Sequence, residues 1–314
     1  MTFGLIVRAT ETGLGYQTRE IYRHLNPDLT VVIDMSQVPG HAQDRQHFDW
    51  YPDGIVTTWR GVRTPLINKS VVRQLAEMDT VMSVETWYDL AIPREARRSI
   101  LYVNPELFGR EPATQYWVPT SWLVDRLPPH TRVVPMPVNT DLPWEAGEGL
   151  LHVDGVGAAA DRNGLEITLR AAKAAGVDVN VASQQADLNL AYGTRVEAAD
   201  PVDLYRHGSV LIMPRRYGGL SLPVQEAMAA GLAVVMPDCA PNPQTWPVKT
   251  FGGKWGGKVA LPGGLIRQYV PDWRDLASVL RDMGWVPEYQ ERSRIWAASH
   301  SWDLLGDTWR ELLK

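Results

Sequence analysis

The chain has 314 residues, more than a single hydrophobic core normally accommodates, so two domains are expected. Its composition, 45% hydrophobic and 21% charged, is that of an ordinary globular protein and excludes a disordered, collagenous or coiled-coil chain. The formal net charge of -5 gives no overall attraction to nucleic acid or to an anionic membrane.

Cysteine content and the N-terminal sequence indicate where the protein works. Cys239 is the only cysteine, which excludes an internal disulfide and a cysteine-based zinc site and favours a reducing cytoplasm. Residues 1–8 lack a basic n-region, and no stretch reaches about 18 consecutive apolar residues. We therefore expect neither an export signal nor a membrane span, and a cytoplasmic location.

Short apolar runs alternate with helical patterns through the first half of the chain. Strands are expected at 3–9, 29–34, 54–58, 80–84, 99–103, 116–119 and 132–134, and helices at 16–25, 66–78 and 121–126. Strands that alternate with helices pair in parallel through right-handed crossovers. This half therefore predicts an open α/β sheet.

The same pattern starts again after a linker at 135–149 that is rich in proline and glycine. Strands are expected at 150–153, 177–181, 210–213 and 233–236, and helices at 165–175, 201–206 and 222–230. One or two amphipathic helices with several tryptophans follow at the C-terminal end. Two such sheets in tandem predict a ligand site at the carboxyl ends of their strands, in a cleft between the domains.

The first glycine-rich loop, at 10–19, lies between a strand and a helix. Gly13 and Gly15 would let the backbone approach a ligand, with N–H groups of the helix available to phosphate or sugar oxygens. The dinucleotide fingerprint is incomplete, because its third glycine position holds Thr18, and no Gly-Lys-Ser/Thr follows as in a P-loop. A plain strand–helix turn is the alternative.

A second loop, at 155–164, again joins a strand to a helix. Small residues leave space there, and Arg162 at the helix start could hold a phosphate through two hydrogen bonds. The alternative is a surface arginine that pairs with Asp161.

The third loop, at 213–221, has the most specific pattern. The amides of Gly218 and Gly219 would face a ligand, and Pro223 suits the first turn of the following helix. Glu226 is expected in that same turn, where the helix dipole favours a carboxylate that could accept hydrogen bonds from the two hydroxyls of a ribose. Arg215 and Arg216 are either part of this site or a solvated pair.

Acidic and aromatic residues follow the strand at 80–84. Glu85 or Asp89 could orient an acceptor or stabilise positive charge on a sugar, and Trp87 and Tyr88 could stack on it; the alternative is a helix cap and a core aromatic pair. His41, His47 and His130 lack metal-ligand spacing and are expected at the surface. With no Asp-x-Asp motif, we expect no metal site.

These segments together resemble the retaining GT-B glycosyltransferases of the group 1, family 4-like type. The resemblance is carried by residues 13–15, 118–122, 134–139, 162–164 and 222–231. Their compact form is most similar to glycosyltransferases encoded by actinobacterial phages.

The resemblance implies two Rossmann-like, doubly wound domains that face a central cleft. The N-terminal acceptor domain would span 1–145 and the nucleotide-sugar domain 146–295, with a C-terminal helix at 296–314 that packs back on the first domain.

It also implies roles for individual residues. Glu226 matches the glutamate that holds the ribose, and Arg162 and Asn163 match the basic position for the diphosphate. The donor loop that binds sugar and phosphate comprises Gly219, Leu220, Ser221 and Leu222, and Gly13 and Gly15 match the N-terminal loop at the phosphate and acceptor.

Two positions depart from the pattern. Gly218 stands where the family has the first of two glutamates, and Asn163 where it has a lysine, which leaves Arg162 as the nearest cation, with Arg215 or Arg216 beside it.

We therefore expect a hexosyltransferase-type enzyme that uses a UDP- or GDP-sugar, with retention and without metal or further cofactor. Its acceptor would be a virion protein, a modified DNA base or a small molecule, in the host cytoplasm if a phage encodes it. The alternatives are a catalytically silent GT-B-like binding module and an NAD enzyme, the latter disfavoured by the missing third glycine.

Overall fold

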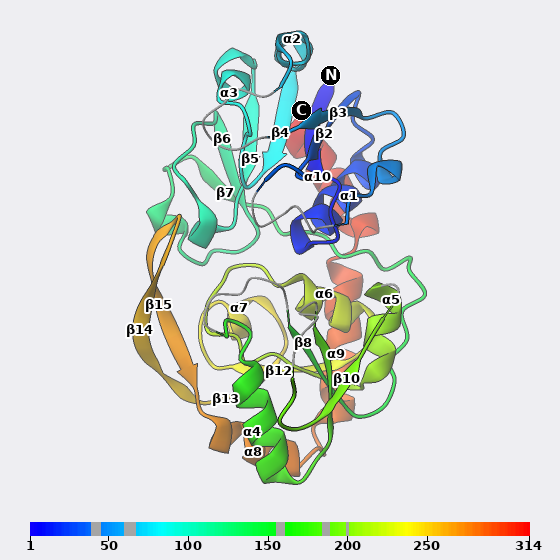
Figure 1. Ribbon diagram of the computed structural model, residues 1–314, viewed down its shortest axis with the longest axis vertical. Helices are drawn as coiled ribbons and strands as arrows, with labels where there is room; N and C mark the ends of the chain where they lie inside the picture. The colour runs from blue at the N-terminus through cyan, green and yellow to red at the C-terminus, as the bar shows by residue number, and fades with distance from the viewer. Residues whose placement is uncertain (39–44, 60–66, 155–160, 184–188, 199–200) are drawn as a thin grey trace. The chain divides into compact units, whose positions relative to one another are not determined.

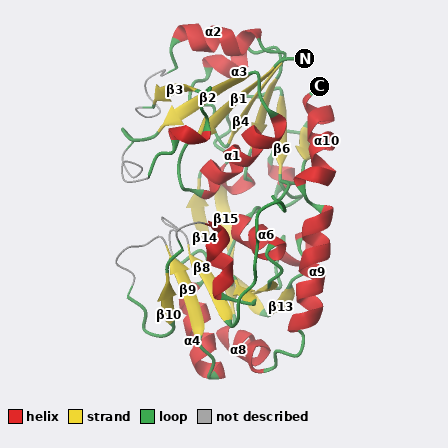
Figure 2. Ribbon diagram, turned by 90° about the vertical axis from the view of Figure 1, so that its right-hand side faces the viewer, coloured by secondary structure: helices red, strands yellow, loops and turns green. Residues whose placement is uncertain are grey.

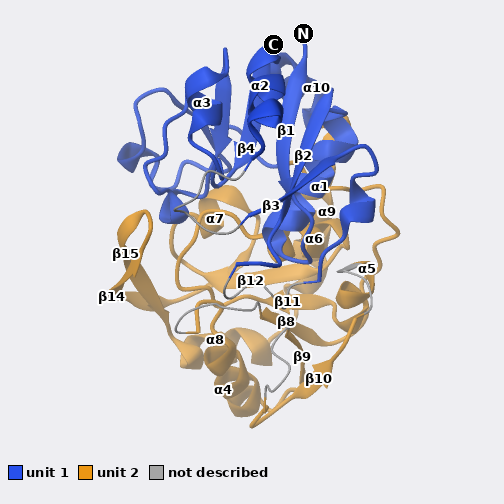
Figure 3. Ribbon diagram, turned by 45° about the horizontal axis from the view of Figure 1, so that its top comes forward, with its two compact units in different colours: residues 1–136, 305–314 blue, residues 137–304 orange. Residues whose placement is uncertain are grey.

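The computed structural model describes residues 1–38, 45–59, 67–154, 161–183, 189–198 and 201–314 (Figure 1). It separates into two compact units (Figure 3). Unit 1 comprises Met1–Met136 and Leu305–Lys314, and unit 2 comprises Pro137–Leu304. The chain therefore leaves unit 1 at residue 136, before the boundary expected at 145.

Unit 1 contains a seven-stranded parallel sheet in the order β3-β2-β1-β4-β5-β6-β7. Its strands are β1 (Phe3–Arg8), β2 (Leu29–Asp34), β3 (Ile55–Thr58), β4 (Thr80–Val84), β5 (Ser99–Tyr102), β6 (Gln115–Val118) and β7 (Thr131–Val133). Its helices are α1 (Gly13–Leu25), α2 (Lys69–Glu77) and α3 (Ala91–Glu95), with 3₁₀ turns at Phe48–Trp50, Pro105–Leu107 and Val124–Arg126. The chain builds outward from β1 to β3 and then returns to place β4 on the other side of β1.

The C-terminal helix α10 (Trp302–Leu313) supplies the last residues of unit 1. Trp309 is 1% exposed; its indole N–H donates to the carbonyl of Pro135 at 3.0 Å, and its ring packs on Tyr102 and Trp117. The guanidinium of Arg98 donates to the last carbonyls of the helix. Trp296, expected in the same returning helix, lies instead in α9 (Val286–Ser299) and in the core of unit 2.

Unit 2 contains a six-stranded parallel sheet in the order β10-β9-β8-β11-β12-β13. Its strands are β8 (Leu150–Asp154), β9 (Val179–Ser183), β10 (Thr194–Val196), β11 (Val210–Ile212), β12 (Ala233–Pro237) and β13 (Lys249–Phe251). Its other helices are α4 (Leu165–Ala175), α5 (Pro201–Leu204), α6 (Leu222–Ala229), α7 (Asn242–Thr245) and α8 (Trp273–Arg281), with a 3₁₀ turn at Tyr205–His207.

Successive side chains on these strands point to opposite faces of the unit 2 sheet, and those on both faces are buried under helices. Leu150, Val210 and Val235 pack with α4 and α8 on one face, whereas Leu151, Leu211 and Val234 pack with α6 and α9 on the other. Figure 2 shows the helices on both sides of the strands. The predicted pair of doubly wound, parallel α/β sheets is confirmed.

An antiparallel hairpin, β14 (Gly253–Leu261) and β15 (Gly264–Pro271), stands apart from the six-stranded sheet. The sequence pattern predicts no element there. One residue of β15 reaches the functional region, because the N–H of Tyr269 donates to the carbonyl of Arg216 at 2.9 Å. Of the helices in the described part of the chain, none has the length and apolar character needed to cross a membrane.

Candidate functional site

Each sheet has a point where the strand order reverses, and the loops that leave it carry most of the residues singled out from the sequence. In unit 2, β8 and β11 are parallel neighbours that connect to opposite sides of the sheet. The loop after β11 covers 213–221, and the described part of the loop after β8 covers 161–164. Ligands of doubly wound sheets bind at this edge.

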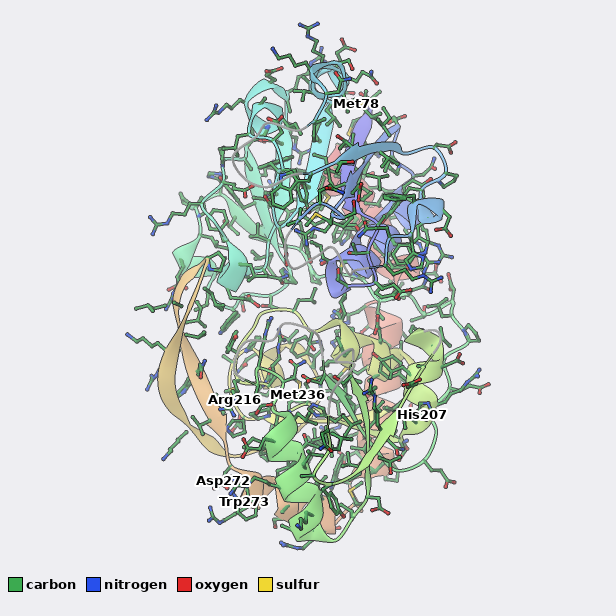
Figure 4. All side chains as sticks on the ribbon, viewed as in Figure 1. Met78, His207, Arg216, Met236, Asp272 and Trp273 are labelled. Carbon is green, nitrogen blue, oxygen red and sulfur yellow. The ribbon has the colours of Figure 1, made fainter. Side chains whose placement is uncertain are left out.

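Hydrogen bonds join the 161–164 loop to the 213–221 loop. The backbone N–H of Arg216 donates to the carbonyl of Arg162 at 2.9 Å. The guanidinium of Arg216 donates to the carbonyl of Asp161 at 3.0 Å and to its carboxylate at 3.1 Å. Figure 4 labels Arg216 in this region. Asp161 therefore pairs with Arg216, not with Arg162 as the alternative from the sequence held.

Gly164 brings the turn at 161–164 against the other loop. Its φ is +78°, and a Cβ placed on it would lie 2.5 Å from the carbonyl oxygen of Pro214. A side chain is excluded there by both backbone conformation and space. The glycine thus fixes the position of Arg162 and of Asn163, which is half-buried.

Two arginines converge on Gly218. A Cβ on this glycine would lie 2.0 Å from one guanidinium nitrogen of Arg215 and 2.4 Å from one of Arg162. Arg215 is 4% exposed, and Arg162 lies over the ring of Tyr217, 5.1 Å from its centroid. Arg215 and Arg216 are thus not a solvated pair.

The donor loop leads directly into α6. Gly219, Leu220 and Ser221 are buried and Leu222 is half-buried. The carbonyl of Ser221 accepts the N–H groups of Val224 and Gln225, both at 3.2 Å. Pro223 occupies the first turn of the helix, as predicted.

Glu226 stands one turn further into α6 than predicted. The helix begins at Leu222, so Glu226 lies in its second turn, where the helix dipole has little effect. The half-buried carboxylate instead accepts a hydrogen bond from the hydroxyl of Tyr205 at 2.7 Å. Burial, together with the nearby Glu226 charge, raises the pKa of Tyr205 well above its usual value, so the phenol stays protonated and donates. The prediction of a first-turn carboxylate was wrong.

In unit 1 the strand order reverses between β1 and β4, which are parallel neighbours. The loops that follow these two strands therefore correspond to the 161–164 and 213–221 loops of unit 2. Gly13 is exposed at the first position of α1, where Thr12 caps the helix by accepting the N–H of Gly15. A Cβ on Gly15 would lie 1.8 Å from the carbonyl oxygen of Thr10. Close packing within the chain therefore accounts for this second glycine.

The residues after β4 have different surroundings. Glu85 has a φ of +67°, a conformation that costs energy for a residue other than glycine, and its carboxylate accepts from the amide of Asn104 at 2.9 Å. Asp89 accepts the N–H of Ala91, the first residue of α3, at 2.9 Å, but Leu90 and not Asp89 occupies the N-cap position. Trp87 and Tyr88 are buried in the core. The placement of Trp87 and Tyr88 is that of the core aromatic pair, whereas neither Glu85 nor Asp89 is the N-cap residue of α3.

The three histidines differ in their placement. His130 is exposed, and His41 lies outside the described residues. His47 is mostly buried, with Nε2 2.6 Å from the carboxylate of Glu11 and its ring stacked on Trp50. Within the described residues, no group of three or more His, Cys, Asp or Glu is placed to hold a metal ion.

Residues 166–246 match the family described as "Glycosyl transferases group 1". This segment holds α4 except its first residue, the 213–221 loop and α6. A search of curated protein sequences finds no match.

Solved structures match over all or most of the chain. The protein Alr3699/HepE from Anabaena, in complex with UDP and glucose, is 12% identical with a TM-score of 0.68, and the match covers 100% of this chain and 99% of that one. Sucrose-phosphate synthase from Thermosynechococcus elongatus is 14% identical with a TM-score of 0.66, over 99% of both chains. A chain of the GtfA/B complex is 13% identical with a TM-score of 0.55; the match covers 78% of this chain but only 59% of the other. The fold is GT-B.

Within this GT-B fold, two contacts were not foreseen from the sequence. Tyr205 comes from the 3₁₀ turn before β11 and reaches Glu226 on α6, and Arg162 comes from the loop after β8 and reaches Gly218. Each pair joins segments that are distant in the sequence, so no local pattern signals the contact.

Proposed function

We propose that this chain is a glycosyltransferase that moves a hexose-type sugar from a UDP- or GDP-sugar to an acceptor hydroxyl. The match to glycosyl transferases group 1 carries the proposal, because it falls on the segment with Glu226 and the 213–221 loop. The GT-B neighbours include a protein in complex with UDP and glucose, which supports a nucleotide-sugar donor.

The nucleotide would lie along the reversal point of unit 2. Glu226, oriented by the Tyr205 hydroxyl, would accept hydrogen bonds from the ribose hydroxyls. The amides of the donor loop would bind the donor sugar and phosphate, with Arg162 and Asn163 at the diphosphate. Arg216 is bonded to Asp161 and would act by holding the 161–164 turn in place.

The transfer breaks the bond between the anomeric carbon and the phosphate oxygen, whose electron pair leaves with the nucleoside diphosphate. A new bond forms between the acceptor oxygen and the anomeric carbon, and the proton of the acceptor hydroxyl passes to the departing diphosphate oxygen. Arg162 would neutralise the leaving diphosphate, a task that elsewhere falls to a metal ion. We propose retention of configuration and no requirement for metal or a further cofactor.

On the acceptor side, the proposal assigns the N-terminal loop with Gly13 and Gly15 and the end of β4. Glu85, held in its unusual backbone conformation, would orient the acceptor or stabilise charge on the sugar ring, with Asp89 beside it in sequence. The acceptor would be a virion protein, a modified DNA base or a small molecule. We further propose a phage-type enzyme that acts in the host cytoplasm.

Calorimetric titration with UDP, GDP and NAD tests the nucleotide assignment. Glu226→Gln should weaken UDP or GDP binding by about 1–3 kcal/mol, the cost of leaving buried polar groups poorly paired. Glu166→Gln, at an exposed position on α4 of the same unit, is the matched control. Unchanged affinity in Glu226→Gln would remove the ribose assignment, and binding of NAD alone would favour the dinucleotide enzyme.

Two further measurements test transfer and retention. The intact mass of candidate acceptors shows whether a sugar has been transferred. The anomeric configuration of the product, determined afterwards, shows whether the transfer retains configuration.

A catalytically silent GT-B-like module is the second candidate. It is favoured by Gly218, where the resembling family has a glutamate and this chain has two guanidinium groups. Such a module would bind UDP or GDP but would neither hydrolyse nor transfer the donor sugar. Slow release of free sugar from a bound donor would rule it out.

A further inference from the structure

The hairpin β14–β15 carries charge of one sign only. Residues 253–271 contain Lys254, Lys258 and Arg267 but no aspartate or glutamate, although the whole chain has a net charge of -5. All three cations are exposed, and none of the ion pairs within the described residues involves them. The hairpin is therefore a local positive surface on an acidic chain.

The strand register places two of these cations on one face of the hairpin together with apolar side chains. Lys258 pairs with Arg267 and Ala260 with Leu265, and residues directly opposite each other lie on the same face. One extra residue between Trp255 and Lys258 keeps these two side chains on that face. We call it the hairpin face; its exposed members are Trp255, Lys258, Ala260, Leu265 and Arg267.

The two cations of the hairpin face repel each other. Like charges directly opposite one another on antiparallel strands are destabilising. The guanidinium of Arg267 lies over the ring of Trp255, 5.2 Å from its centroid, a contact that leaves its charge in place. An anionic partner on the hairpin face would remove the repulsion between Lys258 and Arg267.

The remaining side chains favour a lipid surface as this partner over a nucleic acid. Trp255 is 41% exposed and Leu265 59% exposed, and tryptophan is enriched where a membrane meets water. Nucleic-acid contacts also draw on serine, threonine and asparagine, and residues 253–271 contain none of these. Ile266, which points to the opposite face, is buried, so one side of the hairpin is left for a partner, as a planar surface requires.

We propose that the hairpin face docks the protein on the anionic surface of a lipid membrane. Lys258 and Arg267 contact the headgroup phosphates, and Trp255 lies at the boundary between headgroups and acyl chains. The N–H of Tyr269, in β15, donates to the carbonyl of Arg216, so docking would hold the 213–221 loop close to the membrane. The inference goes beyond the proposed sugar transfer and does not require it.

Cosedimentation of the full chain with vesicles tests the docking. Vesicles of equal parts phosphatidylglycerol and phosphatidylcholine are compared with vesicles of phosphatidylcholine alone, in low salt. We expect partition onto the anionic vesicles to be about tenfold or more stronger, because each lysine or arginine near an anionic surface contributes about fivefold. Added salt should weaken this partition, since it screens exposed charges.

Variants then locate the binding on the hairpin face. Lys258→Gln and Arg267→Gln should each weaken partition onto the anionic vesicles about fivefold. Trp255→Ala should reduce the binding that remains at high salt, because the indole does not depend on lipid charge. Arg170→Gln, at an exposed arginine on α4, has the same loss of charge outside the hairpin and should partition as the wild type does. Thermal unfolding establishes that each variant is folded.

Equal partition of the wild type onto the two kinds of vesicle would overturn the proposal. So would an equal loss in Arg170→Gln and Lys258→Gln, because net charge and not the hairpin would then decide the binding. Binding of a duplex DNA probe without partition onto vesicles, lost in Lys258→Gln, would assign the face to nucleic acid instead. Titration with UDP and GDP keeps the two proposals apart, since failure of the proposed function leaves vesicle binding intact.

Discussion

The hydrogen bond between Tyr205 and Glu226 determines how the proposed ribose-binding carboxylate is held. Tyr205 is fully buried and packs edge-on against Trp144, so its hydroxyl has a fixed position. Its raised pKa keeps the proton on the phenol at any pH used for binding measurements. One carboxylate oxygen of Glu226 is thus fixed before any nucleotide arrives, which reduces the entropy lost on binding.

Removing the Tyr205 hydroxyl tests whether it orients the Glu226 carboxylate, because the packing of the Tyr205 ring is kept. Tyr205→Phe keeps the ring and should lower the free energy of unfolding by about 1 kcal/mol, the net value of one hydrogen bond. Tyr192→Phe is the control, since the Tyr192 hydroxyl donates to the carbonyl of Val177 at 3.0 Å in the same unit. Both variants should lose similar stability in urea unfolding, but only Tyr205→Phe should weaken UDP or GDP binding. Equal nucleotide affinities in the two variants would contradict an orienting role.

His152 makes the stability of unit 2 depend on pH. It is fully buried on β8, with Nδ1 3.0 Å from the carbonyl oxygen of Ile212. Burial lowers its pKa from 6.5 to about 4, because the charged imidazolium cannot be solvated there. Between these two values the unfolded chain binds a proton and the folded chain does not, so acidification favours unfolding.

The free energy of unfolding should therefore be constant above pH 6.5 as far as this group is concerned, and fall by up to about 3 kcal/mol as the pH approaches 4. Urea unfolding of the wild type and of His152→Gln across this range measures the effect. The variant should show a smaller loss, whereas His130→Gln, at an exposed histidine, should follow the wild type. Parallel curves for wild type and His152→Gln would contradict the assignment.

At the scale of elements, helix α4 packs on the sheet of unit 2, and the turn that precedes it lies against the 213–221 loop. A glycine with positive φ precedes it and another follows it, Gly164 at +78° and Gly176 at +72°. They differ in their surroundings, because a Cβ on Gly164 would collide with Pro214 whereas one on Gly176 would meet open space.

Alanine at the two positions should therefore have different consequences. Both variants carry the strain of a positive φ, about 1 kcal/mol, but Gly164→Ala must also push the 161–164 turn away from the 213–221 loop. We expect Gly164→Ala to lose more stability in urea and to weaken nucleotide binding, and Gly176→Ala to bind nucleotide normally. A similar affinity in both variants would indicate that the contact between the loops is not needed for binding.

Some elements of the fold could be predicted from the sequence alone, and others could not. Apolar runs predict β8 and β11, and the polar start and apolar pattern predict α4 with the bounds that the structure has. The hairpin β14–β15 was not predicted, because β14 contains three glycines, is mostly exposed and lacks a clear alternating pattern. Glu226 was identified, but its partner Tyr205 and the approach of Arg162 to Gly218 depend on tertiary packing between distant segments.

At the scale of the whole molecule, the two units differ in how the chain forms them. Unit 2 is one continuous segment, whereas unit 1 needs both ends of the chain. Leu313 illustrates this dependence, since its carbonyl accepts from the Thr80 hydroxyl and the Arg98 guanidinium. The loops with Arg162, Gly218 and Glu226 all lie within unit 2, so nucleotide recognition should be a property of that unit.

A fragment of residues 137–304 should therefore fold cooperatively and bind UDP or GDP with an affinity within about threefold of the full chain, a difference below 1 kcal/mol. Glu226→Gln in the fragment should weaken binding as it does in the full chain. Residues 1–136 alone should not fold stably, because burial of Trp309 against Tyr102 and Trp117 is lost, and adding a peptide of residues 302–314 should restore structure. Circular dichroism and calorimetry measure both effects. A folded 137–304 fragment that binds no nucleotide, while the full chain does, would show that unit 1 supplies essential contacts.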